Sequence, residues 1–396
     1  MTVKDCLDTS RRASSVTICR DDYRETGRFP IVDQSARPIA GWTDNADAVV
    51  EDGLPLVVFG DHTRALKYVD FPFARGADGT QLLRTRHDID AKFLYYACRQ
   101  IDLPSRGYNR HFALLREQQV RVPRTMEEQR DIARVLDSVE QAIAVEEQLS
   151  ATAEEFKAAL LSFAFTRGLR GKSQQETESG PVPGGWENVQ VSDLGDVVTG
   201  TTPPTKVAGY YDGGDVPFIT PGDVSHSRPI ESTKRHLTAA GLLVSRPLPR
   251  GATCVVCIGA TIGKVGMATA DTSATNQQIN AVVPRVSYDP RYVFYALAFH
   301  ADKFRRAATP GPVPLLSKGA FGQLAVFVAP DRGEQEEIAE VLQAVDNKLS
   351  LHRTRGALLG ELFHSLLQKL MVGEIRAGGL NLEALPPVTK ASAVTR

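Results

Sequence analysis

The sequence lacks several features that would place it in a common class of proteins. Its 396 residues include five scattered cysteines and no apolar run near the ~20 residues of a membrane-spanning helix. An odd, dispersed set of cysteines favours free thiols in a reducing cytoplasm over a disulfide framework. The first residues, MTVKDCLDTSRR, have no apolar stretch typical of a signal peptide. The net charge of −1 argues against a broadly basic nucleic-acid-binding surface, although a local basic stripe remains allowed.

Catalytic and metal-binding signatures are also lacking. No Gly-rich dinucleotide fingerprint follows a predicted strand, and there is no Asn-Pro-Pro-aromatic loop of an adenine methyltransferase. CVVC (254–257) lies in a β-branched run, which predicts a strand with its two thiols on opposite faces and no zinc site. GATIGKVG (259–266) has the glycine spacing of a turn rather than of a phosphate-binding loop, and it places Lys264 on that turn.

An internal repeat is the strongest signal that is present. EEQRDIARVLDSVEQAI (127–143) aligns without a gap with GEQEEIAEVLQAVDNKL (333–349), 206 residues later. The spacing is far too long for a solenoid, so it predicts a duplicated unit made of a domain and a long helix. Asp90 and Tyr96 recur as Asp289 and Tyr295, which extends the duplication into the domains.

Both copies of the repeat predict a long helix with a coiled-coil seam, because apolar residues recur at four-three spacing. After a phase shift, the pattern is expected to resume further along each helix. The residues expected to pack helix on helix are Ile132, Leu136, Val139, Ile143, Phe156, Leu160, Ile338, Leu342, Val345, Leu349, Leu362 and Leu366. Forty-odd residues make a rod of roughly 60 Å, which cannot bury such a stripe alone. The alternative is that each helix packs only on its own domain.

These patterns give an expected organisation of the α+β class. Two mixed α/β domains are joined by two long antiparallel helices related by a pseudo-two-fold axis. The expected boundaries are a first domain at 1–124, a first helix at 125–170, a linker at 171–185, a second domain at 186–330, a second helix at 331–376 and a flexible tail at 377–396.

Two regions have compositions that suit nucleic-acid contact. TNQQIN (275–280) groups amides that could bond an adenine edge, although amides equally often brace loops. In the first domain, arginines outnumber acids between about residues 84 and 124, and Tyr108, Asn109 and Phe112 lie among them. This excess fits phosphate contact, although a solvated face is the alternative.

At this point the sequence resembles a family, the specificity subunits of type I restriction–modification enzymes. The resemblance rests on VPGGWENVQVSDLGDVVTGTTP (182–203), on GATIGKVG and TNQQIN, and on the two repeated helices, and it spans nearly the whole chain. The first unit departs from the pattern because it has no counterpart of Gly185-Trp186.

The resemblance implies a non-catalytic, DNA-binding subunit. Each domain would be a target recognition domain for one half of a split, asymmetric double-stranded site. The helices would set the spacing and dock two methyltransferase subunits, and restriction subunits could join. S-adenosylmethionine, ATP and Mg²⁺ are expected on those partners, and no cofactor, metal or membrane is expected on this chain. The candidate DNA contacts are Arg64, Lys67, Arg106, Arg110, His111, Thr202, Lys206, Tyr210, Tyr211, Asp223, Lys264, Asn276, Gln277 and Gln278.

Two other functions compete with this interpretation. A self-contained methyltransferase or nuclease with a fused recognition domain would need a cofactor motif, which the sequence lacks. A coiled-coil adaptor that binds only proteins would leave no footprint on DNA.

Overall fold

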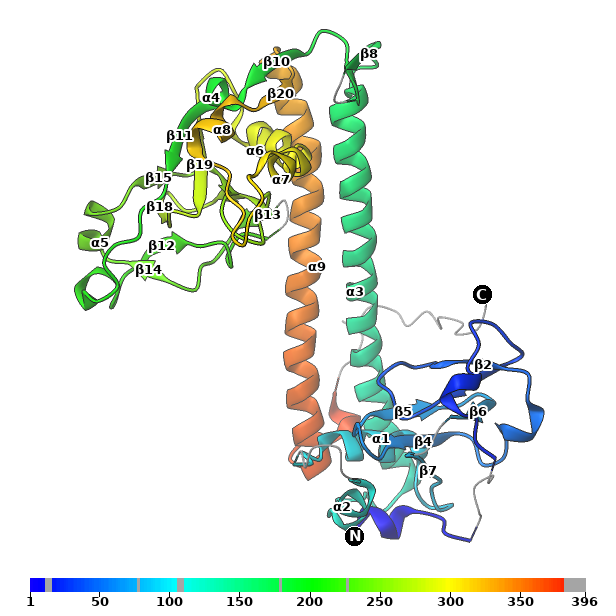
Figure 1. Cartoon of the computed structure of the whole chain (residues 1–396). Helices are drawn as coiled ribbons and strands as arrows, with labels where there is room; N and C mark the ends of the chain where they lie inside the picture. Colours follow the sequence, from blue (N-terminus) through cyan, green and yellow to red (C-terminus); the bar gives the residue numbers. More distant parts are fainter. Residues whose placement is uncertain (11–15, 77–78, 105–109, 178–179, 226–227, 381–396) are drawn as a thin grey trace. The chain divides into compact units, whose positions relative to one another are not determined.

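The computed structural model describes residues 1–10, 16–76, 79–104, 110–177, 180–225 and 228–380. The chain divides into two compact units: unit 1 is Met1–Gln148 with Arg353–Arg396, and unit 2 is Leu149–His352. Each unit contains one α/β domain and part of both long helices, α3 (Met126–Arg167) and α9 (Arg332–Val372) (Figure 1).

The ends of both long helices follow from local sequence. At the start of α3 the amide of Glu128 donates to Thr125 Oγ1, and at the start of α9 the amide of Gly333 donates to Asp331 Oδ1. Each helix ends at a glycine in the left-handed region, Gly168 (φ +69°) and Gly373 (φ +71°). The observed helices are therefore slightly shorter than the expected 125–170 and 331–376.

The two long helices pack antiparallel in each unit. In unit 1, Glu146 of α3 meets Arg355 of α9, and in unit 2, Lys157 of α3 meets Asp346 of α9. Residue numbers thus rise along α3 as they fall along α9. The predicted fold class, two α/β domains with long antiparallel helices, is confirmed.

Unit 1 has two small sheets and two short helices. The first sheet has the strand order β2-β1-β6-β3 and the second the order β5-β4-β7. The elements are β1 (Phe29–Val32), β2 (Gly41–Thr43), β3 (Val49–Val50), β4 (Leu56–Gly60), β5 (Leu66–Val69), β6 (Phe73–Arg75), β7 (Thr80–Leu83), α1 (Ala91–Gln100) and α2 (Phe112–Glu117). Helix α1 lies on β4 and β5 and turns its other face to the long helices.

Unit 2 is built on the same plan with larger sheets. A five-stranded sheet has the order β11-β19-β16-β17-β13, and a four-stranded sheet has the order β14-β12-β18-β15. Its strands are β8 (Gln174–Thr177), β9 (Gly180–Pro183), β10 (Glu187–Gln190), β11 (Gly195–Thr199), β12 (Val216–Ile219), β13 (Arg228–Ile230), β14 (His236–Leu237), β15 (Pro247–Pro249), β16 (Thr253–Val256), β17 (Val265–Ala268), β18 (Thr272–Thr275), β19 (Ile279–Pro284) and β20 (Ala325–Val328). Its short helices are α4 (Val191–Leu194), α5 (Ala239–Leu243), α6 (Pro290–Phe299), α7 (Ala301–Ala307) and α8 (Lys318–Gln323).

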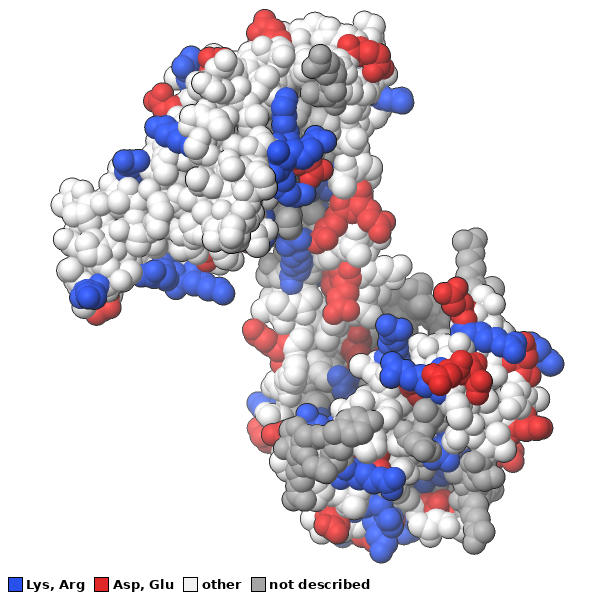
Figure 2. Space-filling model, in the orientation of Figure 1, with Lys and Arg blue, Asp and Glu red and all other residues white. Residues whose placement is uncertain are grey.

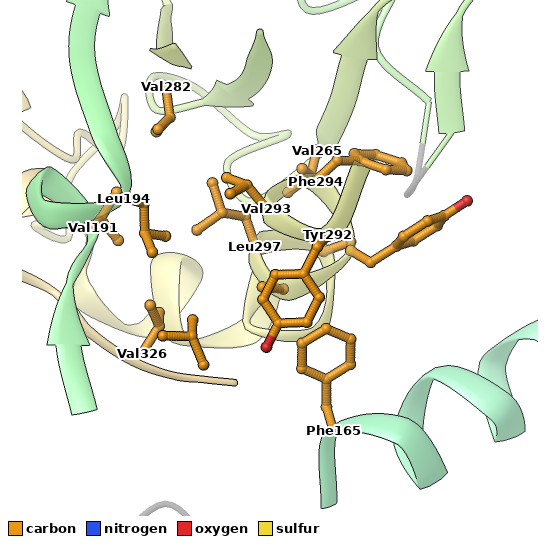
Figure 3. Packing of buried hydrophobic residues seen from close by; sticks show 14 of the residues in the cluster. Phe165, Val191, Leu194, Val265, Val282, Tyr292, Val293, Phe294, Leu297 and Val326 are labelled. Carbon is orange, nitrogen blue, oxygen red and sulfur yellow. The ribbon is translucent and has the colours of Figure 1, made fainter. Parts of the chain in front are cut away.

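The core of unit 2 joins the domain to the end of α3. Figure 3 shows Phe165 of α3 against Tyr292 of α6, with ring centroids 5.5 Å apart. The indole of Trp186 meets the Phe165 ring edge-on at the same distance. In unit 1 the equivalent core includes Tyr96 of α1 and Leu136 of α3, and the Tyr96 ring lies 6.1 Å from the ring of Phe363 of α9. Each domain therefore packs on both long helices, so both expected modes of helix burial occur together.

The expected phase shift in the helix seam is wrong. Phe156 and Leu362 are 57% and 42% exposed, and the next residues, Lys157 and Phe363, are buried instead. The four-three spacing in fact continues without interruption from Ile132 to Ala164 and from Ile338 to Leu370. Apolar periodicity does not predict this continuation, because the middle positions in α3, such as Glu146 and Lys157, are not apolar. The other expected seam residues are at least partly buried.

The structure also differs from the expected linker and flexible tail. Within segment 171–185, β8 and β9 pair antiparallel, Thr177 Oγ1 donates to the carbonyl of Gly180, and Val182 is buried. The tail begins with a 3₁₀ turn at Ala377–Gly379, whose first residue is buried in unit 1. The rest of the tail, from residue 381, lies outside the described residues.

Candidate functional site

One repeated glutamine fixes each domain to its long helix. In unit 1, Gln129 accepts a hydrogen bond from the Asp90 amide (2.8 Å) and donates to the carbonyls of Asp88 and Pro123. In unit 2, Gln335 accepts from the Asp289 amide (3.0 Å) and donates to the carbonyl of Ala329. Both glutamine side chains are buried, so their bonds to backbone define the angle at which the chain enters the helix.

A repeated tyrosine and carboxylate form the second junction. Tyr96 donates to Glu140 of α3 (2.8 Å), and Tyr295 donates to Asp346 of α9 (2.7 Å). Burial, together with the adjacent carboxylate, raises the pKa of both phenols far above the usual value. The phenols therefore stay protonated and serve as hydrogen-bond donors. They are structural groups, not acid–base catalysts.

In unit 2, three loops meet beside β11 and β18 and carry most of the candidate polar residues. Thr202 Oγ1 donates to Gln277 Oε1 (2.5 Å), which ties the loop after β11 to the loop after β18. Asn276 donates to Gln278 Oε1 (2.9 Å) and accepts from the Gln278 amide. A Cβ on Gly200 would lie 2.2 Å from the Asn276 carbonyl oxygen, so only glycine allows this approach.

The amides of this cluster differ in availability. Asn276 and Gln278 are half-buried and bond to each other, so they brace the loop. Gln277 is exposed, and among the described residues its side-chain nitrogen has no partner. Lys264 lies on the neighbouring turn between β16 and β17, and its ammonium likewise has no hydrogen-bond or ion-pair partner in the described part of the chain. Gln277 and Lys264 are thus the side chains of the cluster that can bind an external group.

Three other candidates in unit 2 have internal roles. Tyr211 donates to the carbonyl of Pro203 (2.6 Å), and its ring lies under the guanidinium of Arg235. The Asp223 carboxylate accepts from Thr220 and from the Lys234 amide, which closes its own turn. Tyr210 is half-buried beside α5, where its carbonyl accepts from the Thr238 amide. Lys206 is exposed on the loop after β11.

The candidates in unit 1 are mostly occupied within the fold. His111 is buried, and its amide donates to Asp61 Oδ1 (2.8 Å). Lys67 donates to the carbonyl of Asp33 (2.8 Å), and burial lowers its pKa. Arg64 has a positive φ of 64° and donates to the carbonyl of Leu103 (2.6 Å). Arg110 is well exposed, 3.9 Å from Asp61.

The local arginine excess expected to hold phosphate is likewise largely paired. Arg84 donates to the carbonyl of Asp52, Arg86 pairs with Asp88, and Arg99 pairs with Glu140. Arg106, Tyr108 and Asn109 lie outside the described residues. Unit 1 therefore offers fewer free cations than its composition indicated.

Two arginines that sequence reasoning missed support the loops of unit 2. Arg246 donates to the carbonyl of Thr199 (2.8 Å), at the start of the loop that carries Thr202. Arg235 covers the rings of Tyr211 and Phe218. No pattern in the sequence distinguishes them from solvent-facing arginines, because their roles depend on contacts across the fold.

The described residues contain no evident reactive centre. Cys254 packs in one hydrophobic cluster and Cys257 in another, and burial raises their pKa values to about 12 and about 11. The opposite-face prediction for these thiols is confirmed. Among the described residues, no group of three or more His, Cys, Asp or Glu could hold a metal ion. None of the described helices is both long and apolar enough to cross a membrane.

Comparisons with known proteins agree with this arrangement. A family model for the type I restriction modification DNA specificity domain matches residues 183–359. The specificity subunit of the EcoR124I/EcoR124II type I restriction enzyme from Escherichia coli is 22% identical over 340 residues, which make up 82% of this chain and 81% of that protein. The HindI specificity subunit from Haemophilus influenzae is 30% identical over 203 residues, or 49% of this chain and 42% of that protein.

Solved structures share the fold. The S subunit of a type I restriction–modification system from M. genitalium superposes with a TM-score of 0.66 at 13% identity, covering 94% of this chain and 95% of that one. A structure from work on complex assembly and conformational transition of the type I system gives a TM-score of 0.52 at 16% identity, over 95% and 97% of the two chains.

The matched DNA specificity domain and the paired long helices place the chain among the DNA-binding specificity proteins. The chain belongs to the specificity subunits of type I restriction–modification enzymes. Its part in such an enzyme is recognition of a DNA sequence, and it is a non-catalytic component.

Proposed function

We propose that the two domains read the two halves of a bipartite, asymmetric DNA site. The observation that carries this proposal is a contrast within each domain, between the residues that contact the long helix and the loops that lie away from it. The same glutamine and the same tyrosine–carboxylate pair fix each domain to its long helix, whereas the turn after β4 is shorter than the corresponding turn after β16. Two domains that are held by equivalent contacts but carry different loops would select two different half-sites.

In unit 2 the reading surface would be the meeting of the three loops described above. Gln277 presents a free amide nitrogen, and an Asn or Gln side chain can bond an adenine edge in the major groove. Its oxygen is held by Thr202, which fixes the direction of the amide before DNA arrives. Lys264 on the adjacent turn would contact a phosphate. Lys206, which is exposed on the loop that carries Thr202, is a further candidate.

The two long helices would set the spacing of the half-sites and dock two methyltransferase subunits. Large apolar side chains are exposed on these helices, and exposed apolar groups often mark protein-binding surfaces. Phe156 of α3 and Leu362 of α9 are aligned by the 206-residue repeat, and both are exposed. Matched apolar positions on the two helices suit two copies of one partner. S-adenosylmethionine, ATP and Mg²⁺ would be bound by the methyltransferase and restriction subunits.

Binding to half-site variants of the target tests this reading. Gln277→Ala, assembled with the methyltransferase subunits, should lose roughly 10- to 100-fold affinity for a duplex with the intact second half-site, since one bidentate contact discriminates by about 1–3 kcal/mol. Its affinity for a duplex mutated in that half-site should change little. Gln175→Ala, an exposed glutamine in β8, is the matched control. Equal loss on every duplex would assign Gln277 to loop folding and contradict the proposal.

A further inference from the structure

The seam between α3 and α9 is apolar near its ends and polar in the middle. The four-three positions of α3 are Ile132, Leu136, Val139, Ile143, Glu146, Ser150, Ala153, Lys157, Leu160 and Ala164. The aligned positions of α9 are Ile338, Leu342, Val345, Leu349, His352, Gly356, Leu359, Phe363, Leu366 and Leu370. The ends are thus alike in both helices, but the middle differs: α3 has two buried charges where α9 has His352 and Phe363.

Each buried charge of α3 is met by an opposite charge of α9. Glu146, 2% exposed, forms an ion pair with Arg355, whose Nε lies 3.3 Å from Glu146 Oε1. Lys157 Nζ lies 2.6 Å from Asp346 Oδ1, and both side chains are less than a tenth exposed. Asp346 also receives the Tyr295 hydroxyl, so the charges in this part of the seam are well satisfied. Breaking a buried pair by removing one partner is strongly destabilising.

The surrounding charges also differ in sign between the aligned segments of the two helices, although Glu154 pairs with Arg228 of β13 (2.9 Å) and not with α9. Between residues 146 and 155, α3 has Glu146, Glu147, Glu154 and Glu155 and no Lys or Arg. The aligned segment of α9, residues 352–361, has His352, Arg353, Arg355 and Glu361. Figure 2 shows the acidic side chains gathered over the middle of α3. The middle of one helix is acidic and that of the other is largely basic.

A second copy of the same helix could supply only one of these partners. By the 206-residue repeat, Asp346 corresponds to Glu140, so Lys157 would still meet a carboxylate in an α3–α3 pair, whereas Glu146 would meet no cation. The repeat places Leu149 of α3 where α9 has Arg355, so an antiparallel α3–α3 pair would leave two copies of Glu146 without a cation and bring two acidic segments together. An α9–α9 pair would place Arg355 beside His352 and would oppose Asp346 to Phe363. Because the apolar ends are so similar, the apolar seam alone would accept either pairing.

We propose that the charged centre of the seam makes α3 accept α9 of the same chain and reject α3 of a second copy. The central residues therefore act as a pairing code, in the sense that they determine which of two otherwise similar helices pair with each other. Its consequence is that one chain folds back on itself with one copy of each domain. Pairing between identical helices would instead make an intermolecular dimer with exchanged segments. This inference rests on the fold and on no assumption about the DNA sequence.

Moving one arginine tests the code in the full chain. Leu149→Arg combined with Arg355→Leu keeps the composition and makes α3 self-complementary, because Glu146 of one copy can then meet the new arginine of another. The matched control, Ala151→Arg with Arg355→Leu, also removes the native pair but puts the arginine at an exposed position off the seam. Light scattering measures the mass against 43.1 kDa for one copy.

We expect the first variant to dimerise at least 10-fold more tightly than the control, while the parent chain stays monomeric. Equal dimerisation of the two variants, or a parent chain that is already dimeric, would overturn the proposal. A second comparison covers variants that fold poorly. Glu146→Arg with Arg355→Glu reverses the pair and should melt within about 3 °C of the parent, whereas Arg355→Glu alone should melt well below it. If the double variant melts as low as the single one, the pair does not direct the pairing.

Discussion

In unit 1 the amide of Asp90 donates to Gln129 of α3, and in unit 2 the amide of Asp289 donates to Gln335 of α9. The same correspondence holds for the tyrosine–carboxylate pairs. The cation beside each carboxylate, however, comes from a different element: Arg99 of α1 in unit 1 and Lys157 of α3 in unit 2. Duplication has thus kept the acceptors of these hydrogen bonds but not the element that supplies the cation. Of the two carboxylates, Asp346 is buried, whereas the side chain of Glu140 is 36% exposed.

Away from the helices the two units diverge. In unit 1 the turn after β4 returns from Gly60 to Arg64, whereas in unit 2 the corresponding turn runs from Val256 to Gly263 and is three residues longer. Helix α7 packs on that longer turn, since a Cβ on Gly263 would lie 2.7 Å from the Ala301 carbonyl oxygen. The space beside the unit 1 turn is instead a pocket of about 400 Å³ lined in part by Arg64 and Tyr95. The contacts with the long helices are thus alike in the two units, whereas the turns away from the helices differ.

The largest effect should come from charging the shared apolar seam. Leu136→Asp in unit 1 and Leu342→Asp in unit 2 bury a carboxylate at aligned positions that are fully buried. Each should lower the free energy of unfolding by about 3–5 kcal/mol, because a cavity and an unpaired charge arise together. Urea unfolding measures the loss. Val341→Asp, at a position 43% exposed, is the control and should cost under about 1 kcal/mol.

A sharper contrast is expected at the glutamate that begins each repeat. Glu334 is fully buried in unit 2, where it accepts from Trp186 Nε1 (3.2 Å) and pairs with Lys172 Nζ (2.7 Å). The aligned Glu128 of unit 1 is exposed. Glu334→Ala should therefore cost about 2–4 kcal/mol, since the indole N–H and the ammonium lose their acceptor.

Glu128→Ala is the matched variant and should stay within about 0.5 kcal/mol of the parent chain. Urea unfolding measures the change in the free energy of unfolding for both variants. Hydrogen exchange then locates the loss of stability of Glu334→Ala, which is expected in unit 2. Similar losses in the two variants would mean that the repeat retains this glutamate for a role common to both units, and the contrast drawn from Trp186 would be wrong.

The sequence predicted the repeated scaffold well because burial imposes periodic patterns. Ile132, Leu136 and their counterparts Ile338 and Leu342 are apolar at a spacing that only a helix seam explains. The same reasoning fails at Phe156, where an aromatic residue predicts that the seam continues but the buried residue is Lys157. A charged residue enters the seam only because Asp346 lies opposite it, and a partner 189 residues away leaves no local pattern.

The candidate reading surface was harder to predict for the same reason. TNQQIN contains three amides of similar type, and only the fold shows that Asn276 and Gln278 bond each other while Gln277 is exposed. In unit 1, composition pointed to His111 and Lys67 as ligand-binding groups, but both are buried against backbone carbonyls. Residue type states what a side chain can bind, and tertiary contacts decide whether it is free.

The smallest expected effect distinguishes the residues that end α1 and α6. Ile101 ends α1, and His300 occupies the same place at the end of α6. Burial, reinforced by Lys303, lowers the pKa of His300 to about 4, so the folded state holds this imidazole neutral. Between pH 6.5 and 4 the unfolded chain binds a proton at this imidazole and the folded chain does not. Stability therefore falls as pH falls through this window, and the contribution of His300 is fully present above it. The loss should be about 2 kcal/mol for His300 alone.

His300→Ile, which copies the unit 1 residue, should flatten this part of the pH dependence. Urea midpoints at pH 7.0 and pH 4.5 measure it, and the difference between the two midpoints should shrink in the variant because an apolar side chain binds no proton in either state. His364→Ala, at an exposed position on α9, is the matched control and should keep the acid sensitivity of the parent chain. An unchanged pH dependence in His300→Ile would show that other buried groups, and not the residue that ends α6, make unit 2 sensitive to acid.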